Sequence, residues 1–287
     1  MPTALFRIML MGMAKPLAKL MPLLKPKRRW LQFSLGTAFL VVTALCVGLS
    51  LWVVPAQRQR RAVKAIETLG GTVDYVPFLA LVQGSGVSDP RASETFPITF
   101  LRRWLPPDYF DDVLTVLLTN TRLTDTGLVH LRGLTSLQTL GLGNTQNTDA
   151  GLAHLQGRTG LQNLSLGGSQ VTDAGLAHLQ GLTGLQDLSL GGTQVTDAGL
   201  VYLQGLTGLQ GLGLNNTQIS DVGVARLKGL TSLQRLRLDN TQVTDAGLAH
   251  LQRLTGLLML DLTNTQVTDA GMAQLRTALP ACRIIGP

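Results

Sequence analysis

The chain has 287 residues, of which 45% are hydrophobic, 5% aromatic and 14% charged. This length allows one or two ordinary domains. The two cysteines, Cys46 and Cys282, lie near opposite ends of the sequence, which excludes a disulfide framework or a thiolate metal site, so packing must hold the fold together.

The formal net charge of +7 is concentrated at the N-terminus. Residues 1–64 contain 11 of the 24 basic residues and no Asp or Glu, so the rest of the chain holds 13 basic residues against all 17 acidic ones. A basic patch on the larger part of the chain is therefore not expected, and no nucleic acid partner is predicted.

Residues 1–30 are predicted to form a basic cytoplasmic tail, and residues 31–54 a transmembrane signal anchor. The segment 31–54 (LQFSLGTAFLVVTALCVGLSLWVV) contains no charged residue, and as a helix it would span roughly 36 Å, against a hydrocarbon core of about 30 Å. Trp30 and Trp52 stand near its ends, where indole prefers the headgroup layer. A cleaved signal peptide and a buried core helix are the alternatives.

The N-terminal flank of this segment carries more basic residues than the C-terminal flank. This asymmetry predicts a single-pass protein of the cell membrane, with a cytoplasmic N-terminus and the larger part of the chain in the periplasm or outside the cell. The lipid bilayer is then a partner through residues 31–54.

Residues 55–107 are predicted to hold a juxtamembrane helix, a spacer and an N-terminal cap. Apolar residues at helical spacing run up to Leu69 and are followed by Gly70-Gly71, which should end the helix. Residues 72–100 are consistent with a small strand pair or a loosely ordered spacer. The aromatic residues within 102–110 are expected to cover the apolar end of the domain that follows.

Residues 108–287 contain an internal repeat. One period, beginning at Leu161, is LQNLSLGGSQVTDAGLAHLQGLTG. Aspartates preceded by Thr or Ser and followed two residues later by Gly recur every 24 residues, at Asp125, Asp149, Asp173, Asp197, Asp221, Asp245 and Asp269. Such regularity predicts a solenoid.

The pattern L-x-x-L-x-L-x-x-T-x-V-T-D-x-G-L resembles the leucine-rich repeat family, in the short-helix variety of F-box-associated and bacterial repeat proteins. The resemblance implies an α/β solenoid, a horseshoe with parallel strands on the concave face and short helices on the convex face, closed by a C-terminal cap. Together with residues 31–54, the predicted architecture is this solenoid preceded by one transmembrane helix.

Each repeat position has an expected role. Leu164 and Leu166 alternate at the strand period and should point inward, while Asn163 and Ser165 face outward. The Thr or Ser four residues before each Asp is expected to form a buried ladder of hydroxyls that satisfy the backbone. Each Asp is predicted to be a helix N-cap that accepts backbone N–H groups.

The Asp and His columns raise the question of metal binding. A calcium column is disfavoured because each rung offers one carboxylate. All four histidines, His130, His154, His178 and His250, fall in one column, where packed helices about 8–10 Å apart keep adjacent imidazoles from sharing a zinc ion. No metal, cofactor or catalytic residue is predicted.

Two departures from the repeat fall in one rung. Asn147 replaces the Leu, Val or Ile found at the equivalent positions, and Arg158 replaces a Leu. This rung is therefore expected to be the weakest, and joint replacement by Val and Leu is expected to stabilise the chain.

The outward strand positions and the turn residues after them are the predicted partner-binding residues, and they shift from small to charged along the stack. They are Asn163, Ser165, Asp187, Ser189, Asn215, Arg235, Arg237, Asp239, Asp261 and Thr263. Because Arg is enriched in binding hot spots, Arg235 and Arg237 are the strongest candidates.

The predicted function is a non-catalytic, membrane-anchored interaction module that binds a protein or peptide. The alternatives are an F-box-like repeat adaptor for a ubiquitin-ligase-type complex and a structural envelope protein. No F-box-like region precedes the repeats, so only the repeats carry that resemblance.

Overall fold

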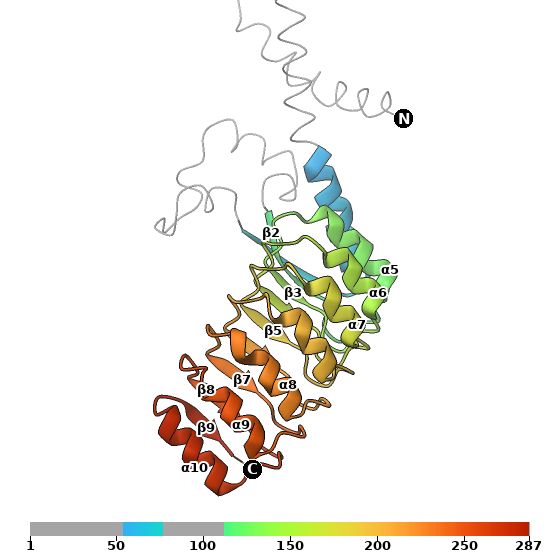
Figure 1. Cartoon of the computed structure of the whole chain (residues 1–287). Coiled ribbons are helices and arrows are strands. Elements are labelled where there is room, and N and C mark those ends of the chain that lie inside the picture. The colour runs from blue at the N-terminus through green and yellow to red at the C-terminus, as the bar shows by residue number, and fades with distance from the viewer. Residues whose placement is uncertain (1–53, 77–111, 287) are drawn as a thin grey trace, which may run out of the picture. The chain divides into compact units, whose positions relative to one another are not determined.

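Figure 1 shows the computed structural model of the chain, which describes residues 54–76 and 112–286. These residues form one sheet backed by a stack of short helices. The sheet has nine strands in sequence order: β1 Thr72–Val76, β2 Asp112–Leu117, β3 Thr139–Gly141, β4 Asn163–Ser165, β5 Asp187–Ser189, β6 Gly211–Gly213, β7 Arg235–Arg237, β8 Met259–Asp261 and β9 Arg283–Ile285.

A short helical segment follows each of the strands β2 to β8 and packs on one side of the sheet (Figure 1). The segments are α5 Asp125–Leu128 with η3 Val129–Gly133, α6 Asp149–Leu152 with η4 Ala153–Leu155, α7 Asp173–Leu176 with η5 Ala177–Leu179, η6 Asp197–Leu203, α8 Asp221–Arg226 with η7 Leu227–Gly229, α9 Asp245–Leu251 and α10 Asp269–Ala278. We call this side the helix face and the opposite side of the sheet the strand face.

The strands stack in a constant register of 24 residues, which confirms the predicted solenoid. From β2 to β9 all pairings are parallel, and Leu140 pairs with Leu164, which pairs in turn with Leu188. The leucines and valines of the motif form a continuous core between the sheet and the helices. The predicted inward and outward alternation is confirmed, since Leu164 is buried while Asn163 and Ser165 are half-exposed.

The buried hydroxyls lie where the chain leaves each strand. The Thr193 hydroxyl donates to the carbonyl of Leu190 at 2.6 Å, and Thr145 and Thr241 make the same bond within their own rungs. The Leu190 carbonyl also accepts the backbone N–H of Thr193 at 3.2 Å, so the hydroxyl is a second donor to it. The predicted ladder is confirmed at these rungs but not at Ser169, whose buried hydroxyl has no hydrogen-bond partner among the described residues.

The predicted role of the aspartates as N-caps is wrong. The N-cap is the preceding residue: Thr172 has extended backbone angles, and its hydroxyl accepts the backbone N–H of Ala174 at 3.3 Å. Asp173 is already the first helical residue, and its carboxylate extends toward the next rung. It accepts the backbone N–H and the hydroxyl of Thr196, in the next rung, at 2.8 and 2.6 Å.

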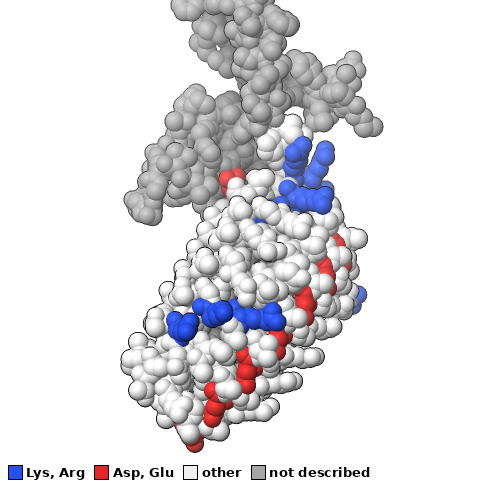
Figure 2. All heavy atoms as spheres, viewed as in Figure 1, with Lys and Arg blue, Asp and Glu red and all other residues white. Residues whose placement is uncertain are grey.

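This bond pair recurs between neighbouring rungs from Asp125 to Asp245. Figure 2 shows the acidic side chains as one regular row along the stacked helices. We call each such Asp, together with the Thr or Ser that it binds in the next rung 23 residues later, a rung clamp. The carboxylate column thus joins rungs to one another.

Residues 54–76 close the N-terminal end of the stack. Residues 54–68 are helical, as predicted, and Gly70 ends the helix with a φ of 79°. Ala62, Val63 and Ile66 are buried in the same core as the repeats. Strand β1 then pairs antiparallel with β2, so that the helix and one strand shield the first rung. The aromatic cap expected within 102–110 lies outside the described residues.

The C-terminal end is a shortened rung, as the sequence predicts. Ile284 of β9 pairs with Leu260, and α10 is the longest helix of the repeats. Cys282 is buried beside this helix, and burial raises the pKa of its thiol, which disfavours the reactive thiolate.

The rung that departs from the repeat contains a polar group in the core. Asn147 is fully buried, and its Nδ2 atom has no hydrogen-bond partner, whereas its Oδ1 faces the Thr145 hydroxyl. Arg158 is half-buried, and its guanidinium donates to the carbonyls of Leu131 and Leu134 in the preceding rung. Arg158 is therefore bonded where its counterparts pack a leucine.

The predicted anchor, residues 31–54, lies outside the described residues apart from its last residue. In the described ranges, no helix is long and apolar enough to cross a bilayer.

Candidate functional site

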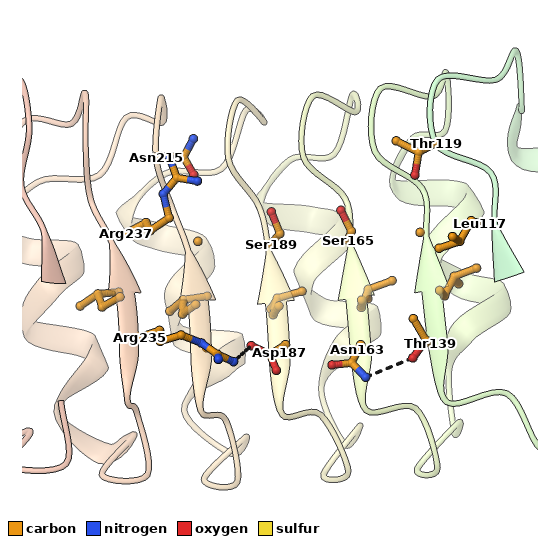
Figure 3. Close-up of a pocket in the computed structure, with 18 of the residues that line it drawn as sticks. Leu117, Thr119, Thr139, Asn163, Ser165, Asp187, Ser189, Asn215, Arg235 and Arg237 are labelled. Atoms are coloured by element: carbon orange, nitrogen blue, oxygen red, sulfur yellow. Dashed lines mark hydrogen bonds and ion pairs between the residues drawn. The ribbon is translucent and has the colours of Figure 1, made fainter. Parts of the chain in front are cut away.

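A groove of about 370 Å³ runs along the strand face from β2 to β8. Figure 3 shows the side chains that line it, projecting from successive strands. Three of the outward strand positions are glycines, so β6 has no side chain in the groove and β3 has only one. Leucines of the core rows and these glycines form its floor, at Leu140, Leu164, Leu188, Leu212, Leu236, Gly141, Gly211 and Gly213.

The first outward position of each strand forms one wall. Asp187 and Arg235 come from strands separated by β6, and their side chains meet across it at 2.7 Å (Figure 3). The intervening residue is Gly211, where an added Cβ would collide with the Asp187 carboxylate. Farther along the wall, Asn163 donates to the Thr139 hydroxyl at 3.1 Å.

The second outward position contributes Ser165, Ser189 and Arg237 to the groove. The Arg237 guanidinium donates through Nε to Asp239 at 3.2 Å. Asp239 is only 7% exposed and also accepts from Asn240 at 3.2 Å. Arg237 is therefore held at its base by a nearly buried carboxylate.

Each of the two arginines in the C-terminal part of the groove therefore forms an ion pair with an aspartate of this chain. Arg235 and Asp187 remain 56% and 42% exposed as side chains, so their ion pair contributes only about 0–1 kcal/mol to stability. Its main effect is on shape, because it fixes the Arg235 side chain across the bare Gly211 strand.

Seven of the ten predicted partner-binding residues line this groove: Asn163, Ser165, Asp187, Ser189, Asn215, Arg235 and Arg237. The remaining three do not. Asp239 lies beneath Arg237, and Asp261 accepts the backbone N–H and hydroxyl of Thr263 at 3.1 and 2.7 Å. These side chains are occupied with the ends of their own strands.

Among the lining residues that sequence reasoning missed, four have outward side chains: Leu117, Thr119, Thr139 and Met259. Leu117 is 43% exposed at one end of the groove, and Met259 stands half-exposed at the other. Both occupy outward positions of their strands, so the repeat register was the available signal. The groove therefore has apolar ends and a polar middle.

The groove contains no arrangement suited to metal chemistry. Within the described ranges, no group of three or more His, Cys, Asp or Glu side chains could hold a metal ion. The imidazoles lie on the helix face, where the Nδ1 atom of His178 is 3.1 Å from the Gln156 amide of the preceding rung. The chemistry available in the groove is hydrogen bonding and apolar contact.

Comparisons with models of protein families and with curated protein sequences gave no match. Solved structures similar to the chain include three bacterial proteins. Internalin C2 from Listeria monocytogenes is 31% identical, with 60% of this chain and 70% of that one covered and a TM-score of 0.49. Internalin InlF from the same species is 24% identical, with 61% and 53% covered and a TM-score of 0.45.

The third is a leucine-rich repeat protein from Leptospira interrogans, 25% identical, with 54% of this chain and 38% of that one covered and a TM-score of 0.42. The chain therefore spans about half or less of the length of the latter two proteins. Its 24-residue motif in seven registers and the parallel stack of strands that this motif builds show that the chain belongs to the leucine-rich repeat family.

Proposed function

We propose that the chain is a membrane-anchored leucine-rich repeat protein that acts as a non-catalytic protein–protein interaction module on the outer side of the membrane. The groove on the strand face is the binding surface, and its partner is a protein or peptide. The observation that carries the proposal is a long, open groove whose two arginines are held in place by carboxylates of the same face.

The dimensions of the groove favour an extended polypeptide over a small molecule. Seven strands contribute to it, and adjacent strands lie about 4.7–4.9 Å apart, which gives a length of roughly 30 Å. An extended segment of about nine residues covers that distance. The bare glycine strand lets a main chain approach the sheet closely.

The charges of the groove favour a partner of mixed polarity. Because Arg235 and Arg237 are each paired, the surface presents matched donors and acceptors without a net field that would attract a polyanion. Leu117 and Met259 add apolar contact at the two ends, where a partner's side chains can be desolvated.

Membrane attachment is the second part of the proposal. The charge-free stretch 31–54 is long enough to span a bilayer, has Trp30 and Trp52 near its ends, and follows the more basic flank. These features support a tether with its N-terminus in the cytoplasm. Such a tether would place the groove at the outer surface.

Site-specific photo-crosslinking tests the groove as the binding surface. A photoreactive residue replaces Ser189 in the groove or, as the matched control, Gln204 on the exposed helix face. We expect one defined protein adduct from position 189 and none of that mass from position 204. Equal adducts from both positions, or none from position 189, would contradict the proposed surface.

Topology is tested with a reporter that is active only outside the cytoplasm, fused after Pro287 in the full-length chain. We expect activity in a membrane pellet that resists carbonate extraction. An inactive reporter would place the repeats inside the cell, reverse the charge argument, and favour a cytosolic adaptor.

A further inference from the structure

A second hollow lies where the helical segments η3 and η4 end and the chain turns toward the next strand, at the rung that departs from the repeat. It measures about 520 Å³, and its lining includes Arg132, Thr135, His154, Gln156, Arg158 and Thr159. Among the described residues, no Asp or Glu lines it. Three of these side chains are basic and two carry hydroxyls, so the lining is rich in donors.

Arg158 enters this hollow because the rung lacks a leucine. The equivalent residues, including Leu182 and Leu206, are fully or almost fully buried in the core. Arg158 instead places its guanidinium against the preceding rung, where the Nη2 atom donates to the Leu131 carbonyl at 2.5 Å. Partial burial lowers the pKa of this guanidinium.

Arg132 approaches the same hollow from the preceding rung. Its Nη2 atom lies 3.0 Å from Nδ1 of His154. Because an arginine can only donate, this contact makes Nδ1 the acceptor, and His154 then carries its proton on Nε2. Most other repeats have Gln at the position of Arg132, as at Gln156 and Gln180.

Two guanidinium groups therefore share one hollow without an anionic partner. Within residues 54–76 and 112–286, neither Arg132 nor Arg158 forms an ion pair with a carboxylate. Each guanidinium has five N–H donors and uses only one or two of them in the bonds described. Two unpaired positive charges with unspent donors match a dianion with several acceptor oxygens.

We propose that this hollow binds a small tetrahedral oxyanion of the phosphate or sulfate class. Arg132 and Arg158 hold the anion through charge-assisted hydrogen bonds. The hydroxyls of Thr135 and Thr159 line the same space and supply neutral donors. The site is separate from the strand-face groove and does not depend on the function proposed for it.

The test measures phosphate binding to the full-length chain in detergent by isothermal titration calorimetry at low ionic strength. Two variants install the residue found in other repeats, Arg158→Leu and Arg132→Gln. The matched control is Arg276→Gln, which removes an arginine from the position of Arg132 in the last repeat. Circular dichroism establishes that each variant is folded.

We expect saturable binding of phosphate and sulfate by the unmodified chain. Each pocket variant should weaken binding roughly ten- to hundredfold, because a hydrogen bond to a charged group is lost, and Arg276→Gln should leave it unchanged. Absence of saturable binding, or equal loss in the Arg276 variant, would overturn the proposal. Acetate binding as tight as phosphate would overturn the assignment to a tetrahedral dianion. Should Arg158→Leu misfold, Arg132→Gln decides alone, since Arg132 is exposed.

Discussion

Asn147 places an amide in a core built mainly from Leu, Val and Ile. The Thr145 hydroxyl is directed both to the Leu142 carbonyl, at 2.6 Å, and to Oδ1 of Asn147. One hydroxyl proton cannot serve both acceptors fully, and Nδ2 of Asn147 has no partner. The cost of burying this group is not offset by its hydrogen bonds.

Replacing Asn147 by Val should therefore stabilise the fold by about 1–3 kcal/mol, the typical cost of a buried unsatisfied polar group. The free energy of unfolding from urea titrations provides the measurement. The reverse change one rung later, Val171→Asn, should destabilise by a similar amount, because Val171 is fully buried. A less stable Asn147→Val variant would contradict this account.

Arg158 behaves differently from the sequence expectation that a leucine there would simply improve the rung. Its replacement would gain apolar burial but lose the bonds to the Leu131 and Leu134 carbonyls. We expect a smaller change in stability for Arg158→Leu than for Asn147→Val, because the two effects oppose each other. The same titrations measure this difference, and a larger gain for Arg158→Leu would contradict it.

The lowered pKa of Asp245 predicts that the stability of the fold depends on pH in the acidic range. The hydroxyl of Thr268, followed by its backbone N–H, holds the pKa of Asp245 below the ordinary value of 3.8. The carboxylate therefore stabilises the fold above that ordinary value, and this contribution is lost as the pH falls through the lower folded value. Asp245→Asn should flatten the pH dependence of the urea midpoint below about pH 4. Parallel profiles for variant and parent would contradict the assignment.

The rung clamps link each helical segment to the start of the next one. Asp173 accepts two bonds from Thr196, whereas Asp269 has the same helix position but no bond from a following rung in the described chain. A comparison of substitutions at Asp173 and Asp269 therefore distinguishes the stability that the clamp contributes from the stability that any acidic residue contributes in the first helical turn.

Asp173→Ala should cost about 2–4 kcal/mol, because two hydrogen bonds to a charged acceptor are lost. Asp269→Ala should cost less than about 1 kcal/mol, since only the interaction with the helix dipole is removed. Unfolding free energies of the two variants decide the matter. Equal losses would mean that the column acts only within each helix.

The helix of residues 54–68 is expected to stabilise the first rung by packing against it. Ile66 is 1% exposed and belongs to the core of the repeats, while its neighbour Glu67 is exposed. Ile66→Ala should destabilise by about 2–5 kcal/mol, as a buried large-to-small change does, and Glu67→Ala should have little effect. Thermal unfolding measures both, and a silent Ile66 variant would show that residues 54–76 do not protect the first rung.

The elements that can be predicted from the sequence are those in which residues recur at a regular spacing along the chain. The 24-residue repeat, the alternation in each strand and the helix before Gly70 all follow from residue spacing. The clamp between Asp173 and Thr196 does not, because capping rules consider only neighbours in the same helix. Likewise, the Asp187–Arg235 pair joins residues 48 apart and depends on the missing side chain of Gly211.

The strand-face groove is a property of the whole stack. Seven of its lining residues follow from the outward pattern, but its apolar ends at Leu117 and Met259 do not stand out as binding residues in the sequence. In a solenoid each rung contacts mainly its neighbours, so a surface change in one rung should leave the others folded. This property allows the groove to be blocked without unfolding the chain.

The most direct test of groove binding compares affinities for the partner identified by crosslinking. An added Cβ at Gly213 would meet Ser189 and Asn215 at ordinary contact distances of 3.5 and 3.6 Å, and at Gly205 it would meet nothing within 4 Å. Gly213→Val therefore fills the groove, and Gly205→Val is the matched control. Surface plasmon resonance with full-length chains should show at least roughly tenfold weaker binding for Gly213→Val, about 1.4 kcal/mol, and unchanged binding for Gly205→Val. Full affinity of a folded Gly213→Val variant would contradict recognition through this groove.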